Sequence, residues 1–247
     1  MKIENQNPAQ YEWGLFPFGD RILPDIRHDP VFKAVFTKDT AESRLALADL
    51  ISAFIGRAVM VETITANEPP IDDFRQRYVR FDAACRTGKG EPVNVEMSYN
   101  PDASEPVCLE YYTAKLFTGQ DKTRDDLKET RQIAILAKGS FFPDEKLTHD
   151  FLYYDSKTNI SFGGKTRIIT VELIKTKSIV DKPVEEMTKA ELWAVFFQYL
   201  TDEAKRDKII EIINREEGIA MAVKILGTFT TLHPRCQAEN TVNHQPA

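Results

Sequence analysis

The stretch RFDAACRTGKGEPVNVEMSYN, residues 80–100, contains two acidic residues inside segments that otherwise have the apolar composition of buried strands. Asp82 lies in the first segment and Glu96 in the second, with a glycine-bounded turn between them. An ionised carboxylate that is removed from water costs several kcal/mol unless a partner compensates it. The stretch therefore predicts either a pair of solvated acids or a site that holds a cation.

The length of the turn decides whether the two acids can meet. Side chains alternate between the two faces of a strand, so the register of the hairpin fixes which residues share a face. A three-residue loop over 88–90 makes Thr87 face Glu91 and sets Asp82 directly across from Glu96. A four-residue loop would place the acids on opposite faces. Because odd-length hairpin loops that contain glycine are common, we expect the first register.

The spacing alone does not show what would compensate two acids that face each other. Directly opposed residues have Cβ atoms about 5 Å apart, and like charges at that spacing repel each other. Mg²⁺ or Mn²⁺ would turn the repulsion into a binding site, because these hard cations prefer carboxylate oxygens. The alternative is that both acids lie on a solvated face of the sheet, balanced by Arg80 or Lys89.

The rest of the chain alternates between helical and strand-like patterns, which predicts an α/β fold with a mixed sheet between helical layers. Asp29, just before Pro30, is expected to be the N-cap of the first helix. Alternation predicts that Phe81 faces the same way as Ala83. Strands are expected over 59–64, 78–85, 93–97, 132–137 and 167–175, and helices over 29–36, 42–55, 105–117 and, repeatedly, after residue 183.

Four segments are expected from these patterns. They are an N-terminal arm over 1–24, a core over 25–180, a C-terminal helical extension over 181–232 and a flexible tail over 233–247. The large apolar side chains of the extension are expected to be packing residues, and a homo-oligomer through the C-terminal helices is expected if the chain is a binding or assembly module.

Composition narrows the classes of protein that fit. Hydrophobic residues make up 42% and charged residues 28% of the 247, which is typical of a globular protein. The start lacks a secretory signal and no run of about 18 apolar residues occurs, so we expect a cytoplasmic protein without a membrane span. Three scattered cysteines and four unclustered histidines favour neither disulfides nor zinc. A net charge of −6 disfavours indiscriminate nucleic-acid binding, but it allows a nuclease with one basic groove.

Five short segments, taken in order and spacing, resemble the PD-(D/E)XK nuclease family transposases, also called recombination-promoting nucleases. The segments are HDPVFKAVF at 28–36, FDAAC at 81–85, VNVEM at 93–97, YYTAKLFTGQ at 111–120 and QIAIL at 132–136. The resemblance covers about residues 25–177. It implies a restriction-endonuclease-like fold and a magnesium-dependent DNA endonuclease associated with transposition and recombination.

The resemblance also implies roles for individual residues. Asp82 would be the family's metal-binding aspartate and Glu96 the acid of its (D/E)XK element. Met97 would be the intervening residue, whose main-chain carbonyl could also bind the metal. Ser98 stands where the family usually has glutamine and the wider superfamily has lysine, a side chain that orients or activates the attacking water. The implied cofactor is Mg²⁺ or Mn²⁺, and the implied partner is DNA.

Two departures from the family pattern lead to two hypotheses. Ser98 cannot supply a positive charge, and Cys108 stands where an arginine is expected. In the first hypothesis Lys115 reaches the metal in place of the missing cation, and the chain is an active endonuclease. In the second, catalysis has been lost and the chain is a PD-(D/E)XK-fold module that acts in binding or assembly.

Other side chains are candidates for contacting DNA. Tyr111 and Tyr112 could stack on a nucleotide, although a tyrosine on a helix face is more commonly part of a core. Basic residues that could position phosphates cluster in sequence around the hairpin: Arg75, Arg77, Arg80, Arg86 and Lys89.

Overall fold

Long and almost fully buried strands form the centre of the molecule. The structure is a computed structural model that describes residues 21–65, 80–120, 122–229 and 231–232. The strands of the main sheet are β2 (Val61–Ile64), β3 (Ala83–Thr87), β4 (Pro92–Ser98), β5 (Thr130–Leu136), β6 (Thr148–Phe151) and β7 (Thr166–Glu172). Every residue of β5 is buried, as expected for a strand covered on both faces.

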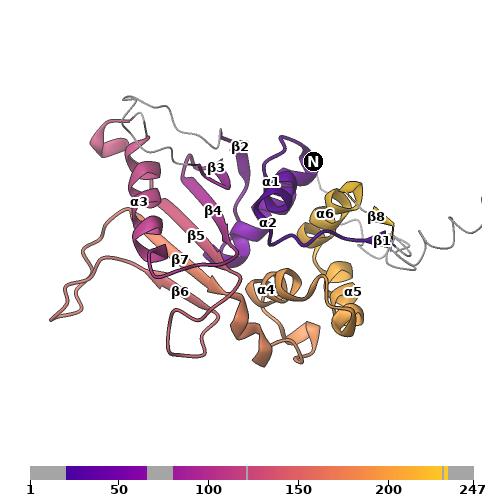
Figure 1. Ribbon diagram of the computed structural model, residues 1–247. Coiled ribbons are helices and arrows are strands. Elements are labelled where there is room, and N and C mark those ends of the chain that lie inside the picture. The colour runs from indigo at the N-terminus through magenta and orange to yellow at the C-terminus, as the bar shows by residue number, and fades with distance from the viewer. Residues whose placement is uncertain (1–20, 66–79, 121, 230, 233–247) are drawn as a thin grey trace, which may run out of the picture.

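The six strands lie in the order β2-β3-β4-β5-β7-β6 (Figure 1). The central strands β4, β5 and β7 run parallel, and the antiparallel strands β3 and β6 flank them. A separate pair, β1 (Arg21–Ile22) and β8 (Thr231–Leu232), joins the two ends of the described chain. The mixed sheet, with helices packed on it, confirms the predicted α/β class.

The hairpin between β3 and β4 has the predicted register. Ala83 pairs with Val95, and the Thr87 N–H donates to the Glu91 carbonyl at 3.0 Å. Gly90 has φ of 74°, a left-handed conformation that glycine adopts without strain. Continued by one residue, the same register sets Asp82 opposite Glu96.

The beginning of β3 differs from the prediction. The strand is expected to start at residue 78 but starts at Ala83. Residues 78 and 79 lie outside the described part of the chain. Phe81 packs with Ala84 rather than on the side of Ala83, so its predicted face is wrong. The alternation of side chains does not extend to a residue that precedes the strand.

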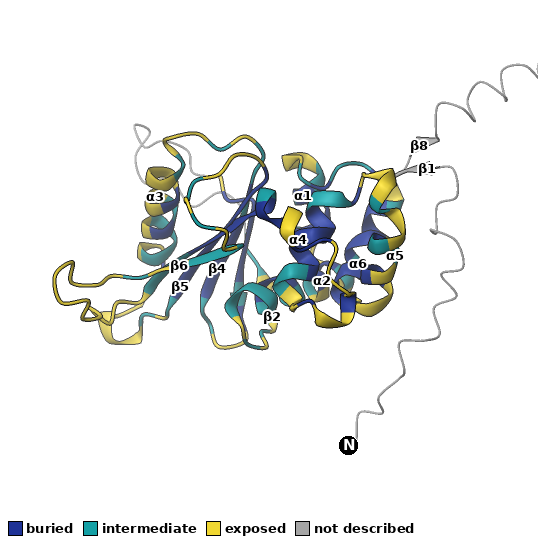
Figure 2. Cartoon of the chain, turned by 90° about the horizontal axis from the view of Figure 1, so that it is seen from below, coloured by how far each residue is buried: buried dark blue, intermediate teal, exposed yellow. Residues whose placement is uncertain are grey.

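A layer of helices covers one face of the sheet. Its members are α1 (Asp29–Phe36), α2 (Ala41–Ile55), α4 (Lys189–Tyr199), α5 (Arg206–Arg215) and α6 (Glu217–Leu226). Their apolar side chains and those of the sheet face form one continuous cluster (Figure 2, dark blue). Phe36 lies between Trp193 and Phe197 in this cluster, with ring centroids 6.0 and 6.3 Å away.

The C-terminal helices share this core with the N-terminal helices. α6 packs closely on α2, where a Cβ atom at Gly218 would overlap the side chain of Asp49. The Asp49 carboxylate accepts hydrogen bonds from the Trp193 indole at 2.9 Å and from Lys189 at 2.8 Å. Residues before and after position 180 therefore belong to one hydrophobic core.

The opposite face of the sheet is covered more sparsely. Its single long helix is α3 (Glu105–Thr118), which packs on β4, β5 and β7 through two small apolar clusters. Beyond α3, the connection between β6 and β7 projects from the edge of the sheet (Figures 1 and 2). Among the residues that the structure describes, α-helices therefore lie on both faces of the sheet, five of them on one face and α3 on the other.

Two predicted boundaries are wrong. α1 begins at Asp29 and its N-cap is His28, whose backbone is extended, so Asp29 lies in the first helical turn, where its carboxylate pairs with Lys33. The strand predicted over 167–175 ends at Glu172 and continues as a 3₁₀ helix, Leu173–Ser178. The remaining 3₁₀ helices are Arg124–Asp126, Val184–Glu186, Glu203–Lys205 and Gly227–Phe229.

Two further expectations concern the ends of the chain and the membrane. Residues 1–20 of the predicted arm and the predicted tail over 233–247 lie outside the described residues. Among the helices that are described, none combines the length and the apolar character that crossing a membrane requires.

Candidate active site

Asp82 lies just before β3, where the ladder between β3 and β4 ends. Its side chain is buried, and Oδ2 accepts a hydrogen bond from the Met97 main-chain N–H at 2.9 Å. The carboxylate thus occupies the place of a main-chain acceptor on the neighbouring strand. This bond holds Asp82 against β4, one residue beyond Glu96 in sequence.

Lys33 of α1 supplies a positive charge to this acid. Its ammonium Nζ lies 2.9 Å from Asp82 Oδ1 and 2.6 Å from Asp29 Oδ1. Burial lowers the pKa of Lys33, but the hydrogen bonds to both acids outweigh that effect, so the pKa is raised. Lys33 is therefore a fully charged ammonium at neutral pH, shared between two carboxylates.

Glu96 shares the α3-facing side of β4 with Asn94. The Asn94 amide donates to Glu96 Oε2 at 3.1 Å and also to Gln132 Oε1 of β5 at 3.1 Å. Asn94 is fully buried, so the strand backbone fixes its position. A ladder of amides across two strands therefore orients the glutamate.

The two acids hold protons more tightly than ordinary carboxyl groups. Burial raises the pKa of Asp82 to about 6, although the Met97 N–H and Lys33 act in the opposite direction. Burial also raises the pKa of Glu96 to about 8, and the negative charge of Asp82 adds to that shift. The single ammonium of Lys33 therefore does not offset the effect of burial on the pKa values of these two acids.

Strand geometry also defines the direction of the Met97 carbonyl. The N–H and C=O groups of one strand residue point toward the same neighbouring strand when that residue is in a hydrogen-bonded pair. The Met97 N–H points to Asp82, whereas the Ser98 carbonyl accepts from Ala137 on the β5 side. The Met97 carbonyl is thus directed toward the side of Asp82.

The other predicted catalytic residues have different surroundings. The Ser98 hydroxyl donates to Glu105 Oε2 at the start of α3, at 3.1 Å. Lys115 lies with its Nζ 5.9 Å from the ring centroid of Tyr111. Within the described residues, the cation that pairs with Asp82 is Lys33, and no ion pair joins Lys115 to either acid. Cys108 is an exposed free thiol on α3.

The two tyrosines differ in exposure, and so do the basic residues that are predicted to contact DNA. Tyr112 packs edge-on against Phe81 at 6.1 Å, while Tyr111 is exposed. Burial raises the pKa of Tyr112, and the charges of Glu96 and Asp82 add to that shift. Of the basic candidates, Arg75 and Arg77 lie outside the described residues, Arg80 and Lys89 are exposed, and Arg86 is partly buried.

The residues present fit a divalent cation. With every group ionised, the carboxylates of Asp29, Asp82 and Glu96 and the ammonium of Lys33 carry a net charge of −2. The donors are hard oxygens, which suits Mg²⁺ or Mn²⁺. In the described part of the chain, no three acidic, histidine or cysteine side chains converge closely enough to hold a metal alone. Asp82, Glu96 and the Met97 carbonyl would therefore need water to complete the ligand set, as Mg²⁺ commonly does.

This sheet and its flanking helices, with two acids on adjacent strands, define the class of restriction-endonuclease-like folds. The family whose sequence model matches residues 26–243 is described as PD-(D/E)XK nuclease family transposase, and the chain belongs to that family. The comparison with curated proteins and the comparison with solved structures gave no match.

One residue of the site was missed by the sequence analysis. Lys33 is part of the segment that carries the family resemblance, but nothing in its spacing connects it to Asp82, which is distant in sequence. The available signal was the pair Asp29 and Lys33, four residues apart on one helix. The pair predicts that Lys33 and Asp29 lie on the same face of the helix, but it does not predict which strand packs against that face.

Proposed function

We propose that the chain is a divalent-metal-dependent endonuclease that hydrolyses phosphodiester bonds of DNA. The observation that carries the proposal is that Asp82 and Glu96 lie together where the β3–β4 ladder ends, with the Lys33 ammonium paired to Asp82. Membership of the nuclease family supports the reaction class. Asp82, Glu96 and the Met97 carbonyl would hold Mg²⁺ or Mn²⁺.

A bound divalent cation supplies Lewis-acid stabilisation of the charge that develops on the phosphate and makes a water nucleophile available at neutral pH. The protein's own groups prepare the site for it. Asn94 fixes the rotamer of Glu96, and the Met97 N–H fixes that of Asp82. Glu96, whose pKa is raised to about 8, must lose a proton when a cation binds at neutral pH, whereas Asp82, with a pKa of about 6, is already mostly ionised.

Lys33 takes the role that the resemblance leaves vacant at Ser98. A compact ammonium next to the acids can stabilise a developing phosphate charge or orient the attacking water. Lys115 stays a second candidate for the same role, since the structure places it on α3 near Tyr111. The two lysines make different predictions and can be separated by substitution.

The proposal is tested by incubating the purified chain with supercoiled plasmid and Mg²⁺ or Mn²⁺. We expect nicking by the wild type and its loss in Asp82→Asn and Glu96→Gln. A matched control is Glu62→Gln, since Glu62 is an exposed acid on the edge strand β2. Equal cleavage by the wild type and both site variants would refute the assignment.

The role of Lys33 is tested with Lys33→Met and Lys115→Met side by side. Loss of a group that stabilises transition-state charge typically lowers kcat by about 10²–10³-fold. We expect such a loss for Lys33→Met and at most a few-fold effect for Lys115→Met. The opposite order would assign the role to Lys115.

A second candidate function is a non-catalytic module that acts in binding or assembly. It is favoured by one observation, namely that both oxygens of Asp82 already have partners, Lys33 and the Met97 N–H. This candidate predicts no cleavage and no metal affinity. Calorimetric titration with Mn²⁺ in two buffers of different ionisation enthalpy separates the two functions. Binding with proton release that Glu96→Gln abolishes would exclude the purely structural role.

A further inference from the structure

The arm between β6 and β7, residues 152–165, is an ordered hairpin that leaves the body of the molecule (Figure 1). The Phe162 N–H donates to the Tyr153 carbonyl and the Asp155 N–H to the Ile160 carbonyl, both at 2.9 Å. The Asp155 carboxylate accepts from main-chain N–H groups at the tip. The arm therefore has a fixed shape through its own hydrogen bonds.

Large apolar side chains of the arm are left in water. Phe162 is 81% exposed and Ile160 66% exposed, and Tyr153 and Tyr154 are each about half exposed. Single exposed apolar residues are common, but a group of them on one rigid element marks an interaction site. Since the arm is already ordered, binding through it would cost little conformational entropy.

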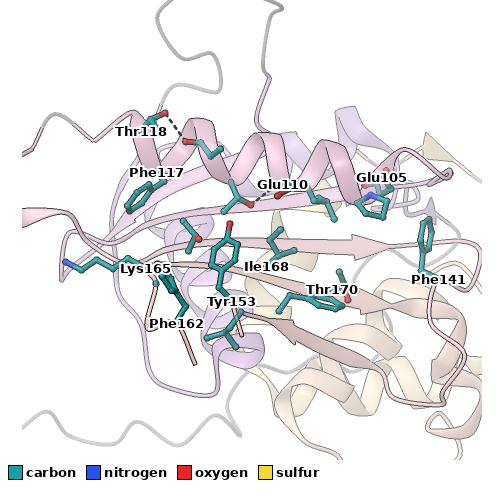
Figure 3. A pocket seen from close by; sticks show the side chains of 18 of the residues that line it. Glu105, Glu110, Phe117, Thr118, Phe141, Tyr153, Phe162, Lys165, Ile168 and Thr170 are labelled. Atoms are coloured by element: carbon teal, nitrogen blue, oxygen red, sulfur yellow. Dashed lines mark hydrogen bonds between the residues drawn. The ribbon is translucent and has the colours of Figure 1, made fainter. Parts of the chain in front are cut away.

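Next to the arm lies an apolar groove, bounded on its other side by α3 (Figure 3). The groove has a volume of about 660 Å³ and is lined mainly by carbon atoms. Leu109 and Phe117 of α3 form one wall, and Ile168 of β7 lies on its floor. The Tyr153 side chain borders it from the arm.

Charges are distributed unevenly along the groove. Glu105 and Glu110 of α3 line one part of it, and Lys165 lies at the end opposite Glu105 (Figure 3). A second exposed lysine, Lys157, lies near the tip of the arm. In a two-fold arrangement the same patch meets itself in reversed direction, so the acidic end of one copy faces the basic end of the other.

We propose that two copies of this chain associate through this surface, with the arm of each copy lying in the groove of its partner. The four exposed apolar residues of the arm present on the order of 500 Å², since a large aromatic side chain carries roughly 200 Å². Two arms, each matched by an equal area of the partner's groove, bury about 2,000 Å², which lies within the range of stable interfaces.

Two other occupants fit the surface less well. A nucleic-acid backbone would meet the carboxylates of Glu105 and Glu110 in a protein of net charge −6. The C-terminal helices, predicted as the oligomer interface, offer a poorer surface, because the described residues of α4, α5 and α6 include no exposed large apolar side chain. The apolar surface available for pairing is concentrated at the arm.

Sedimentation velocity of the full chain tests the proposal. At ~50 µM, above the micromolar Kd that an interface of this size commonly reaches, we expect a particle of twice the 28.2 kDa chain mass. Phe162→Asp should weaken association by ~30-fold or more, as expected for a central anchor. The matched control is Met60→Asp, 76% exposed at the other end of the sheet, which should leave the dimer unchanged.

A charge exchange tests the two-fold placement itself. Lys165→Glu and Glu110→Lys should each raise the dimer Kd, because each places like charges where the acidic part of one groove meets the basic end of the other. The double variant should recover part of the loss, which a merely destabilised fold would not do. A monomeric wild type at ~50 µM, or a dimer that Phe162→Asp leaves intact, would overturn the proposal.

Discussion

The two faces of the sheet are made by the same strands, yet they bury different chemistry. On β4, Val93, Val95 and Met97 enter the large apolar core under the helical layer. Between them, Asn94 and Glu96 face α3, where polar side chains hydrogen bond to one another. We infer that the apolar face provides the stability that allows the other face to bury acids whose pKa values are raised. The predictions below test this division, from the largest expected effect to the smallest.

A charge placed on the apolar face should unfold the protein. Val95 is fully buried and lies next to Glu96, but it has no polar partner. We expect Val95→Asp to destabilise the fold by about 5 kcal/mol or more, because it buries an uncompensated carboxylate. Urea denaturation followed by circular dichroism measures the loss. A Val95→Asp variant as stable as the wild type would show that the two faces do not differ.

Neighbouring residues of β5 compare the two faces at equal burial. Ile135 enters the large core, and Leu136 lies under α3 beside the groove. We expect Ile135→Ala to cost about 4 kcal/mol and Leu136→Ala about 2–3 kcal/mol, because the sparser side can relax around the cavity. The free energies of unfolding of both variants give the difference. A larger loss for Leu136→Ala would reverse the ranking of the faces.

The two acids of the α3-facing side should make stability depend on pH. The folded pKa values of Asp82 and Glu96 lie above their unfolded values, so the folded state binds more protons between about pH 4 and pH 8. In metal-free buffer we therefore expect the free energy of unfolding to fall by about 1–3 kcal/mol as pH rises through this window.

The measurement is urea denaturation from pH 5 to pH 8.5 with EDTA present. Glu96→Gln should flatten the profile and raise the stability at the alkaline end, since it removes the carboxylate with the larger shift. Added Mn²⁺ should also flatten it. An unchanged slope in Glu96→Gln would contradict the assignment of this pH dependence.

The smallest effect concerns Ser98. Its hydroxyl is bonded to Glu105, so its removal should cost about 1 kcal/mol of stability, the usual loss for one hydrogen bond. If Lys33 fills the cationic role, Ser98→Ala should keep cleavage within about threefold of the wild type, since no transition-state charge loses its partner. A loss of a hundredfold would instead make Ser98 a catalytic residue.

The sequence allowed the hairpin to be predicted closely, because its register depends on local turn chemistry. A three-residue loop with glycine at its end sets the ladder from Arg86–Pro92 to Ala83–Val95, and this register leads the chain at Asp82 toward Glu96. The α/β class followed in the same way from local periodicity. Family membership, shown by the match over 26–243, is consistent with the five short segments.

What remained hidden depends on contacts between distant segments. Lys33 reaches Asp82 only because α1 packs against β4. The N-cap predicted at Asp29 is wrong by one residue for a local reason, because Asp29 already lies in the first turn of the helix and His28 is the cap. The exposure of Phe162 and Ile160 could not be predicted either, because the sequence does not show whether other parts of the chain cover an apolar side chain.

The bond between Asp82 and the Met97 N–H has a consequence for how related chains are interpreted. An aspartate here also terminates a β-ladder by satisfying a main-chain donor, so it remains useful to a chain that has stopped cutting DNA. Glu96 likewise accepts from the main-chain N–H of Asp82, beside its bond to the Asn94 side chain. Losing either acid leaves a main-chain donor at the end of the ladder without its partner, so both should persist in related chains that bind no metal.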